Sequence, residues 1–290
     1  MTAEIQTKIE QFDLPHPSGD GMFKISVARV SNATTRVRDA PVLFVLDSDM
    51  SLALAAEIAR LRGTAGLQPT AMVVGVGYGA EVSLMAKLRT EDLTPPLSEA
   101  GKQALGGLTS MIGEKEGGAE AFLSFFIDTL MPEIVERYPE ASLDDHNLFG
   151  HSLGGLFVAY ALLTRPQAFK TFSSASPSLW WDGFAVLEHL PAFANKVKAL
   201  DVQPQVFVCV GGKEQDPPSK TSPLVQMTLD QMQAFVAQAR MVDAAVEFAV
   251  ALREAGLRDV KHIVFEDEDH TSVLPSAIMR GLTIAVARSD

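Results

Sequence analysis

The stretch LFGHSLGGLFVAYALL, residues 148–163, decides the fold, because it joins a strand pattern to a helix pattern through a glycine-rich turn. Within it, residues 150–154 fit the motif G-x-S-x-G. Between a strand and a helix, this motif carries its serine through a tight turn that aims the hydroxyl outward, and glycines two positions to either side remove clashing Cβ atoms. The motif predicts Ser152 as a nucleophile, and a plain glycine-rich turn is the alternative.

Further apolar runs on both sides of the motif extend the pattern to a whole sheet. They lie within residues 40–50, 69–79, 203–212 and 260–270. Runs without polar alternation suit strands that are buried on both faces, and helical patterns lie between them. The first forty residues instead alternate apolar and polar positions. We therefore predict an α/β protein with a doubly wound, mostly parallel sheet, helices on both faces and an antiparallel N-terminal segment.

The chain shows no internal repeat, low-complexity tract or clear linker, so we expect a single domain over residues 1–290. A polar stretch with glycine and proline, at about 81–118, predicts a loop insertion that is long for a connection between a strand and a helix. Helical segments are predicted at 119–139, where the apolar stripe is interrupted only near Pro132, at about 215–258 and at 274–287.

The composition excludes several classes of function. The formal net charge of -12 argues against nucleic acid as a partner, because binding phosphate needs a basic surface. No window approaches the roughly 20 apolar residues of a membrane span, and the first residues do not form a secretory signal. We expect a cytoplasmic protein, monomeric or homodimeric. The one cysteine, Cys209, excludes a disulfide framework and is interpreted as a buried strand residue.

A nucleophilic serine needs a general base, and the sequence offers six histidines. His270 follows the last buried strand, at the edge where a doubly wound sheet presents its sites. We therefore predict His270 as the base and interpret His151, which is adjacent to the serine, as a turn or packing residue. The four remaining histidines are discounted by their positions: His16 in an exposed first turn, His146 before the strand of the serine, His189 on a helix and His262 at the start of a strand.

The acid of a serine hydrolase should follow a strand between the serine and the histidine, because chains of this kind carry the three groups in that order. The segment VFVCVGGKEQD, residues 206–216, offers Glu214 and Asp216. Glu214 is closer to the end of the strand and is preferred. Its carboxylate would hold the imidazole tautomer and stabilise the imidazolium form.

An oxyanion hole needs backbone N–H groups beside the nucleophile. The N–H of Leu153, at the start of the helix, is one candidate. A second would come from the loop after an earlier strand, through Asp49 or Met50. Asp47 and Asp49 in that loop lack the additional clustered ligands of a metal site, so we expect neither a metal nor a cofactor.

From about Phe12 to its C-terminus, the chain resembles the putative esterase (esterase D-like) family of α/β-hydrolases. The resemblance is carried by the GHSLGG turn and its helix, by SPSLWW and EDEDHTSVLP, and by VLFVLDSD, RTEDLTPP and VGGKE. The chain is most similar to the branch of enterobactin, salmochelin and bacillibactin esterases, which open the lactone rings of catecholate siderophores. This resemblance implies an α/β-hydrolase fold, with Ser152 as nucleophile, His270 as base and Glu214 as acid.

The resemblance also implies substrate contacts. Family members place the Arg and Asp of an R-x-x-D-L-T-P loop beside the active site, and the matching residues here are Arg89 and Asp92. Trp180 and Trp181 follow the next strand and either contact substrate or pack beneath their loop. A ferric catecholate is strongly anionic and would favour a basic pocket, whereas this chain is acidic overall.

The sequence thus predicts a serine ester hydrolase that acts on a small-molecule ester through an acyl-enzyme. The resemblance adds the ester or lactone bonds of a catecholate siderophore as the substrate class. Two alternatives are an acyltransferase that uses the same three residues and a non-catalytic ligand-binding homologue. The complete set of serine, acid and histidine argues against the second of these.

Overall fold

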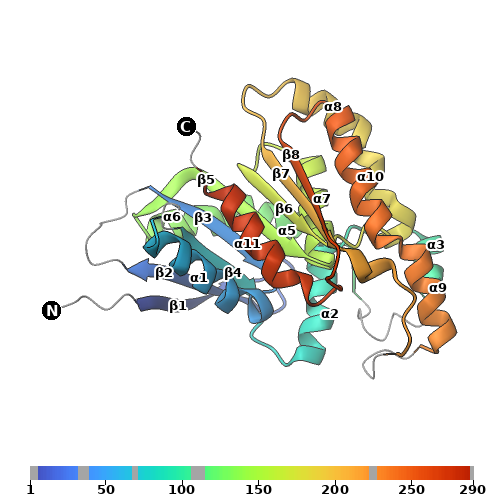
Figure 1. Cartoon of the computed structure of the whole chain (residues 1–290). Coiled ribbons are helices and arrows are strands. Elements are labelled where there is room, and N and C mark those ends of the chain that lie inside the picture. Colours follow the sequence, from blue (N-terminus) through green and yellow to red (C-terminus); the bar gives the residue numbers. More distant parts are fainter. Residues whose placement is uncertain (1–5, 32–38, 67–70, 106–114, 222–226, 288–290) are drawn as a thin grey trace.

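The computed structural model describes residues 6–31, 39–66, 71–105, 115–221 and 227–287. Within these ranges, one eight-stranded sheet runs through the protein in the order β1-β2-β4-β3-β5-β6-β7-β8 (Figure 1). The strands are β1 (Gln6–Pro15), β2 (Met22–Ser31), β3 (Ala40–Leu46), β4 (Met72–Gly77), β5 (Ala141–His151), β6 (Thr171–Ala175), β7 (Gln205–Gly211) and β8 (Val260–Phe265).

Strands β4, β3, β5, β6, β7 and β8 pair in parallel, whereas β2 pairs antiparallel with both β1 and β4. The predicted mostly parallel sheet with an antiparallel N-terminal segment is therefore confirmed. Part of that segment, residues 32–38, lies outside the described residues.

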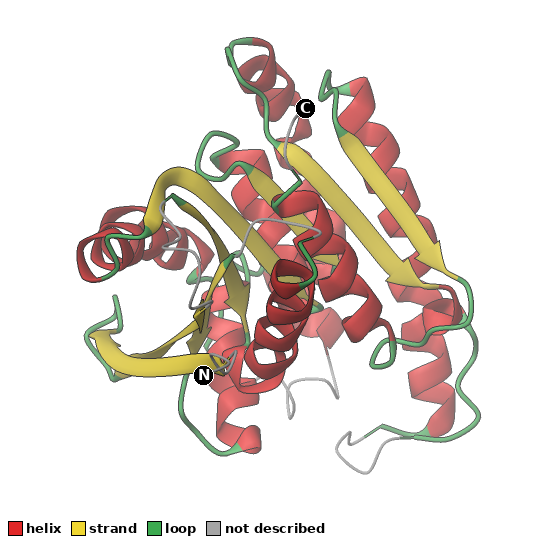
Figure 2. Ribbon diagram, turned by 60° about the vertical axis from the view of Figure 1, so that its left-hand side comes forward, coloured by secondary structure: helices red, strands yellow, loops and turns green. Residues whose placement is uncertain are grey.

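Helices cover both faces of the sheet (Figure 2). α1 (Ser48–Thr64) and α11 (Val273–Ala285) pack together on one face, and α7 (Leu153–Thr164) and α10 (Met241–Glu254) pack on the other. Each face has its own apolar core, because strands such as β3 are buried on both sides. The remaining helices are α2 (Val82–Leu93), α3 (Glu99–Leu105), α5 (Ala119–Phe125), α6 (Met131–Arg137), α8 (Leu190–Lys198) and α9 (Leu229–Ala239), with short turns η2 (Phe126–Leu130), η3 (Trp181–His189) and η4 (Gly212–Gln215).

The parallel register brings the carboxyl ends of the central strands to one edge. His151 at the end of β5 pairs with Ala175 of β6, which pairs with Cys209 of β7, and Gly211 pairs with Phe265 of β8. The loops that carry the predicted serine, acid and histidine all begin at this edge. Cys209 is fully buried within β7, as predicted, and burial raises the pKa of its thiol.

The stretch expected as a loop insertion is largely helical where it is described. It contains α2 and α3, separated by residues 94–98, while residues 106–114 lie outside the described residues. Glycine and the paired prolines suggested a loop, but Pro95 and Pro96 mark only the connection between α2 and α3, and Gly101 lies within α3. Further along, α9 and α10 form the part of the predicted helical segment (about 215–258) from Leu229 onward, while residues 216–221 are not helical and residues 222–226 lie outside the described residues. α11 matches the predicted closing helix.

The helix predicted over 119–139 is continuous but contains one wide turn. In η2 the N–H of Met131 donates to the carbonyl of Phe126, five residues earlier, as in a π-helix. Pro132 follows immediately, at the start of α6. Proline lacks an N–H and crowds the preceding helical turn, so a widened turn accommodates it without ending the helix.

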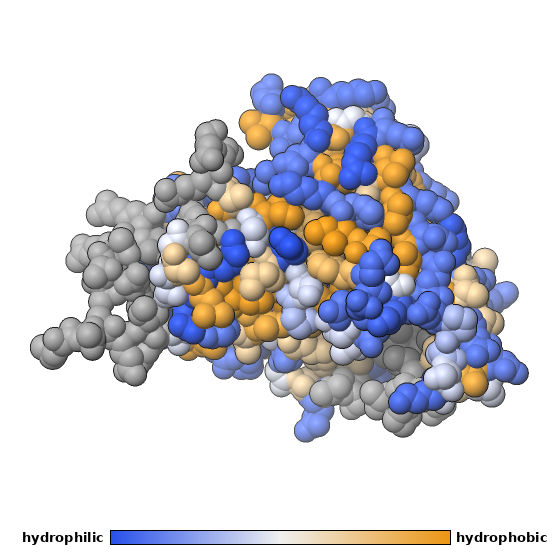
Figure 3. All heavy atoms as spheres, viewed as in Figure 1, coloured by the Kyte–Doolittle hydropathy of each residue, from blue (hydrophilic) through white to orange (hydrophobic). Residues whose placement is uncertain are grey.

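Apolar residues gather in the middle of one face of the molecule, where Figure 3 shows them bordered by hydrophilic residues. On this side of the sheet, Ile263 and Phe265 of the edge strand β8 and Leu274 and Met279 of α11 are only partly buried. β8 is an edge strand because its pairing is with β7 alone among the described strands.

Candidate active site

Ser152 lies one residue beyond β5, where the chain turns directly into α7, and its backbone adopts φ 63° and ψ -120°. A positive φ is uncommon for a residue with a Cβ atom and needs support from its surroundings. The N–H of Ser152 donates to the carbonyl of Ala175 at 3.0 Å, and its carbonyl accepts from the N–H of Ser178 at 3.1 Å. Strand β6 and its following loop therefore hold the turn that the motif predicts.

Close backbone packing explains two glycines around Ser152. A Cβ atom on Gly150 would lie 2.3 Å from the carbonyl oxygen of Gly154, and one on Gly155 would lie 2.6 Å from that of Ala175. On Gly154 the nearest atom would be 3.4 Å away, an ordinary contact. The steric explanation of the motif therefore holds for Gly150, but the second tight position is Gly155 rather than Gly154.

The structure brings the predicted serine, histidine and acid together. Nε2 of His270 lies 3.0 Å from Oγ of Ser152, and Nδ1 lies 2.6 Å from Oε2 of Glu214. With the proton on Nδ1, the ring donates to the carboxylate and accepts from the serine hydroxyl, which is the arrangement a general base needs. Asp216, the alternative acid, is exposed and makes no contact with His270 among the described residues.

Glu214 is buried and remains charged. Burial alone would raise the pKa of its carboxyl, but the hydrogen bond and charge of His270, with further hydrogen bonds from Ser176 and the Gly211 N–H, hold the pKa below its usual value. A buried carboxylate is stable only when partners satisfy it in this way. The loop bearing His270 is fixed in turn by Asp269, whose carboxylate accepts from the N–H groups of Thr271 and Ser272.

His151 packs against the candidate base rather than against the serine hydroxyl. Its ring centroid lies 4.6 Å from that of His270, with the two planes tilted by 39°. Burial and then the neighbouring His270 lower the pKa of His151 to about 3. The ring therefore stays neutral at ordinary pH and serves as a packing residue, as the sequence suggested.

The structure distinguishes between the candidate oxyanion donors. The N–H of Leu153 at the start of α7, like that of Asp49, has no hydrogen-bond partner within the described part of the chain. The N–H of Met50 donates to the carbonyl of Asp47 at 2.9 Å, inside the first turn of α1. Of the two alternatives in this loop, Asp49 is therefore the one with a free N–H.

Arg89 lies on α2 rather than in the predicted loop, and it forms a buried ion pair. Nε and one terminal nitrogen of its guanidinium donate to the two oxygens of Asp47, both at 2.7 Å. The side chains of Arg89 and Asp47 are 12% and 6% exposed. Burial lowers the pKa of the guanidinium, but the Asp47 carboxylate more than offsets this, so the pKa of Arg89 is raised and its guanidinium remains charged.

Asp92, also on α2, is enclosed by protein partners. Its side chain is 2% exposed, one oxygen lies 2.9 Å from Nε2 of His16, and the other accepts from the hydroxyl of Tyr78 at 2.9 Å. Both oxygens are thus occupied within the fold. His16, which was expected in an exposed first turn, is only 12% exposed and joins that turn to α2. The sequence could not show this contact, because the two residues are far apart along the chain.

The two tryptophans differ in burial. Trp181 is 1% exposed and its indole N–H donates to the carbonyl of Pro95 at 3.0 Å, so it packs beneath the loop. Trp180 is only partly buried, and its ring meets that of Phe235 on α9 edge-on, with centroids 4.9 Å apart. For Trp180, contact with a substrate remains a prediction.

The family model described as "Putative esterase" matches residues 31–251, which is more than half of the chain. The chain belongs to this family. Among its relatives, the siderophore triacetylfusarinine C esterase of Aspergillus fumigatus is 33% identical over 251 residues, covering 84% of this chain and 80% of that protein. The ferri-bacillibactin esterase BesA of Bacillus subtilis is 30% identical over 257 residues, covering 85% and 78%.

The fold of this esterase is similar to that of the siderophore hydrolase EstA from Aspergillus nidulans, with a TM-score of 0.82 and 26% identity across 97% of this chain and 95% of that one. The predicted α/β-hydrolase fold is therefore confirmed. Family and relatives together identify a carboxylic ester hydrolase, so the alternative of a non-catalytic homologue is not supported.

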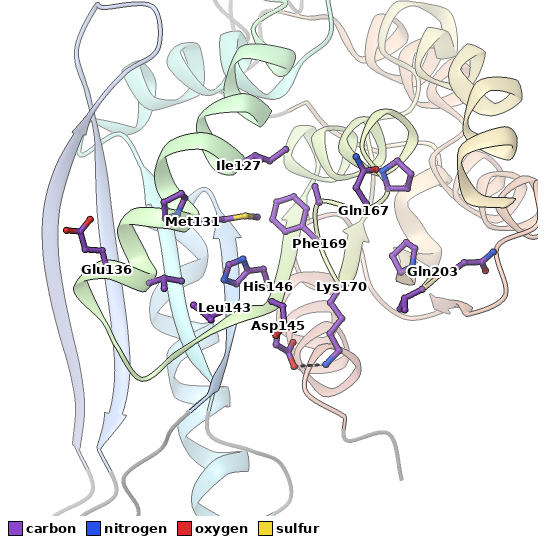
Figure 4. Close-up of a pocket in the computed structure, with 17 residues that line it drawn as sticks. Ile127, Met131, Glu136, Leu143, Asp145, His146, Gln167, Phe169, Lys170 and Gln203 are labelled. Atoms are coloured by element: carbon purple, nitrogen blue, oxygen red, sulfur yellow. Dashed lines mark hydrogen bonds and ion pairs between the residues drawn. The ribbon is translucent and has the colours of Figure 1, made fainter. Parts of the chain in front are cut away.

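A groove of about 990 Å³ lies elsewhere on this esterase, where β5, β6 and β7 begin. Ile127, Met131 and Phe169 line it, together with the ion pair between Asp145 and Lys170 (Figure 4). It is at the edge of the sheet opposite the carboxyl ends of the strands, and none of the predicted site residues lines it. The groove is therefore separate from the candidate active site.

Among the described residues of this esterase, no helix combines the length and the apolar character that crossing a membrane would require. Nor do three His, Cys, Asp or Glu side chains come together in those ranges as a metal site would need.

The contact between His16 and Asp92 should make stability depend on pH. The hydrogen bond to Asp92 raises the pKa of His16 against the opposing effect of burial. A histidine whose pKa is higher in the folded state than in the unfolded state stabilises the fold at pH values below the unfolded-state pKa. This contribution is lost as the pH rises through the folded-state pKa. In urea unfolding, the free energy of unfolding of the wild type should exceed that of His16→Gln by about 1.5–3 kcal/mol near pH 6. The difference between the two proteins should be smaller near pH 9. A difference that is constant over this range would contradict the assignment.

Proposed function

We propose that this esterase hydrolyses an ester bond of a siderophore by nucleophilic catalysis, with Ser152 as nucleophile, His270 as general base and Glu214 as the acid that orients it. The observation that carries the proposal is the continuous chain of contacts from Oγ of Ser152 through the imidazole to a buried carboxylate. The siderophore as substrate class is inferred from the relatives, which are named for siderophore esters.

The first half-reaction forms an acyl-enzyme. His270 takes the proton of the Ser152 hydroxyl as the oxygen attacks the ester carbonyl, and Glu214 stabilises the imidazolium that results. The N–H groups of Leu153 and Asp49 would donate to the carbonyl oxygen as it becomes an oxyanion. The imidazolium then gives its proton to the departing alcohol, and the carbon–oxygen bond of the ester breaks.

The second half-reaction releases the acid. His270 takes a proton from a water molecule, whose oxygen attacks the acyl carbonyl, and the same N–H groups again receive the oxyanion. The proton returns to Oγ of Ser152 as the acyl–serine bond breaks. If an alcohol took the place of water, the same residues would carry out acyl transfer. Hydrolysis is favoured because the relatives are named esterases and hydrolases, and product analysis with an added alcohol distinguishes the two outcomes.

We also propose that residues 1–290 act as one domain, as a monomer or homodimer in the cytoplasm. Support for the single domain comes from the sheet, to which the described strands from both ends of the chain contribute. We propose that Arg89 and Asp92 support the site indirectly, Arg89 by holding Asp47 and Asp92 by holding Tyr78. Trp180 remains a candidate for direct contact with substrate.

Ser152→Ala should abolish turnover of a short p-nitrophenyl ester, because it removes the hydroxyl that lies 3.0 Å from Nε2 of His270. We expect kcat to fall by about a millionfold, the loss typical for removing a catalytic serine, with unchanged circular dichroism. Activity at the wild-type level in this variant would show that the nucleophile is another residue.

Glu214→Gln should lower kcat by about ten-thousandfold, the cost of losing the carboxylate that orients such a histidine. Asp216→Asn is the matched control, since it makes the same chemical change two residues away at an exposed position. Steady-state kinetics on the same ester compare the two. The reverse ranking would transfer the role of the acid to Asp216.

Charge should influence the choice of substrate. The chain carries a net charge of -12, and Asp47 already neutralises Arg89. A ferric complex of three hydroxamates is uncharged, whereas one of three catecholates is strongly anionic. We expect kcat/KM to be about tenfold higher for a neutral ferric hydroxamate ester than for an anionic ferric catecholate ester, with added salt reducing the difference. Faster turnover of the anionic ester that declines with salt would show the opposite preference.

A further inference from the structure

Ser176 occupies an unusual position directly after β6. Its side chain is fully buried, and its backbone adopts φ 42°, which is uncommon for any residue other than glycine. Its N–H donates to the carbonyl of Cys209 in β7 at 2.7 Å. A strained backbone persists only where the surrounding structure determines it, so the place of the Ser176 hydroxyl is fixed by the pairing of β6 and β7.

The Ser176 hydroxyl faces the candidate catalytic acid. Oγ donates to Oε1 of Glu214 at 2.5 Å, and the N–H of Gly211 donates to the same oxygen at 2.7 Å. Oε2, the other oxygen, lies 2.6 Å from Nδ1 of His270. The two oxygens of one carboxylate are thus divided, with one held by the fold and one turned toward the base.

We infer that Ser176 is a positioning residue for catalysis, whose hydroxyl acts with the N–H of Gly211 to restrict the rotation of the Glu214 carboxylate, so that Oε2 stays aligned with His270. The inference rests on the proposed function, because it assumes that Glu214 and His270 act together. A carboxylate is free to rotate about its last bond unless both oxygens are restrained. Fixing it before the reaction avoids reorganisation when the imidazolium forms.

The chemistry of a hydroxyl suits this role better than that of a charged donor. A lysine or arginine at this place would neutralise Glu214 and compete with the imidazolium for its charge. A serine hydroxyl donates a hydrogen bond and leaves the negative charge for His270. Its site is buried, where hydrogen bonds to a charged group are stronger than at the surface.

Ser176→Gly is the most direct test, because glycine adopts the positive φ without strain and only the hydroxyl is lost. We expect kcat on a p-nitrophenyl ester to fall by about 10- to 100-fold, which corresponds to the free energy of one hydrogen bond to a charged group. KM should stay within about twofold of the wild-type value. Ser176→Ala should behave in the same way if it folds. Ser173→Ala is the matched control, since Ser173 is also buried on β6 but its hydroxyl has no partner among the described residues.

A double-mutant cycle separates positioning from a general structural effect. The readout is the rate at which a fluorophosphonate labels Ser152, measured for Ser176→Gly with and without Glu214→Gln. We expect Ser176→Gly to slow labelling only when Glu214 is present. An equal slowing in both backgrounds, or none in either, would overturn the inference. Failure of the wild-type protein to be labelled at Ser152 would instead overturn the proposed function.

Discussion

Two hydrogen bonds to the backbone of Ser152 hold the turn on which the candidate active site depends. The N–H is bonded to Ala175 at the end of β6, and the carbonyl is bonded to Ser178 in the loop that follows. These bonds need β6 to lie beside β5 in parallel register, since only then do the two strand ends meet. The same register places Ser176 against β7, from which Glu214 follows. The parallel pairing of β5, β6 and β7 therefore places both Ser152 and the group that holds Glu214 at the same edge of the sheet.

Each charged side chain named near the serine is held by partners within the fold. Asp47 is held by Arg89, and Glu214 is held by His270 with two uncharged donors. His151, which packs against His270, remains neutral. A buried charge without a partner is costly, so removing either Arg89 or His270 would leave an unsatisfied carboxylate and destabilise the fold. Among these groups, His270 is the one that meets both the solvent and the serine. Its side chain is 44% exposed, and its Nε2 lies 3.0 Å from Oγ of Ser152.

The sequence predicted the parts of this protein that depend on local pattern. Buried strands were visible as apolar runs, and the order of Ser152, Glu214 and His270 along the chain selected three residues that the structure brings into contact. Contacts between distant segments were not visible. Asp92 and His16 are both polar residues in turn-like or helical contexts, and nothing local shows that they bury each other. The helices in the predicted insertion were missed because prolines and glycines dominated a pattern with weak helical periodicity.

The wide turn η2 has a consequence for how this helix can change over evolution. An α-helix rotates by about 100° with each residue, so an inserted or deleted residue normally changes which face of the following helix is buried. A π-type turn is the exception, because it holds one more residue than an α-turn and takes up that residue locally. Phe126 and Leu130, at the two ends of this turn, and Ile134 in α6 are all fully buried. A deletion within η2 would therefore convert it to an ordinary α-turn with the buried face of α6 retained, whereas a deletion elsewhere in the helix would rotate that face toward water. The wide turn is thus a position at which the length of this helix can change by one residue.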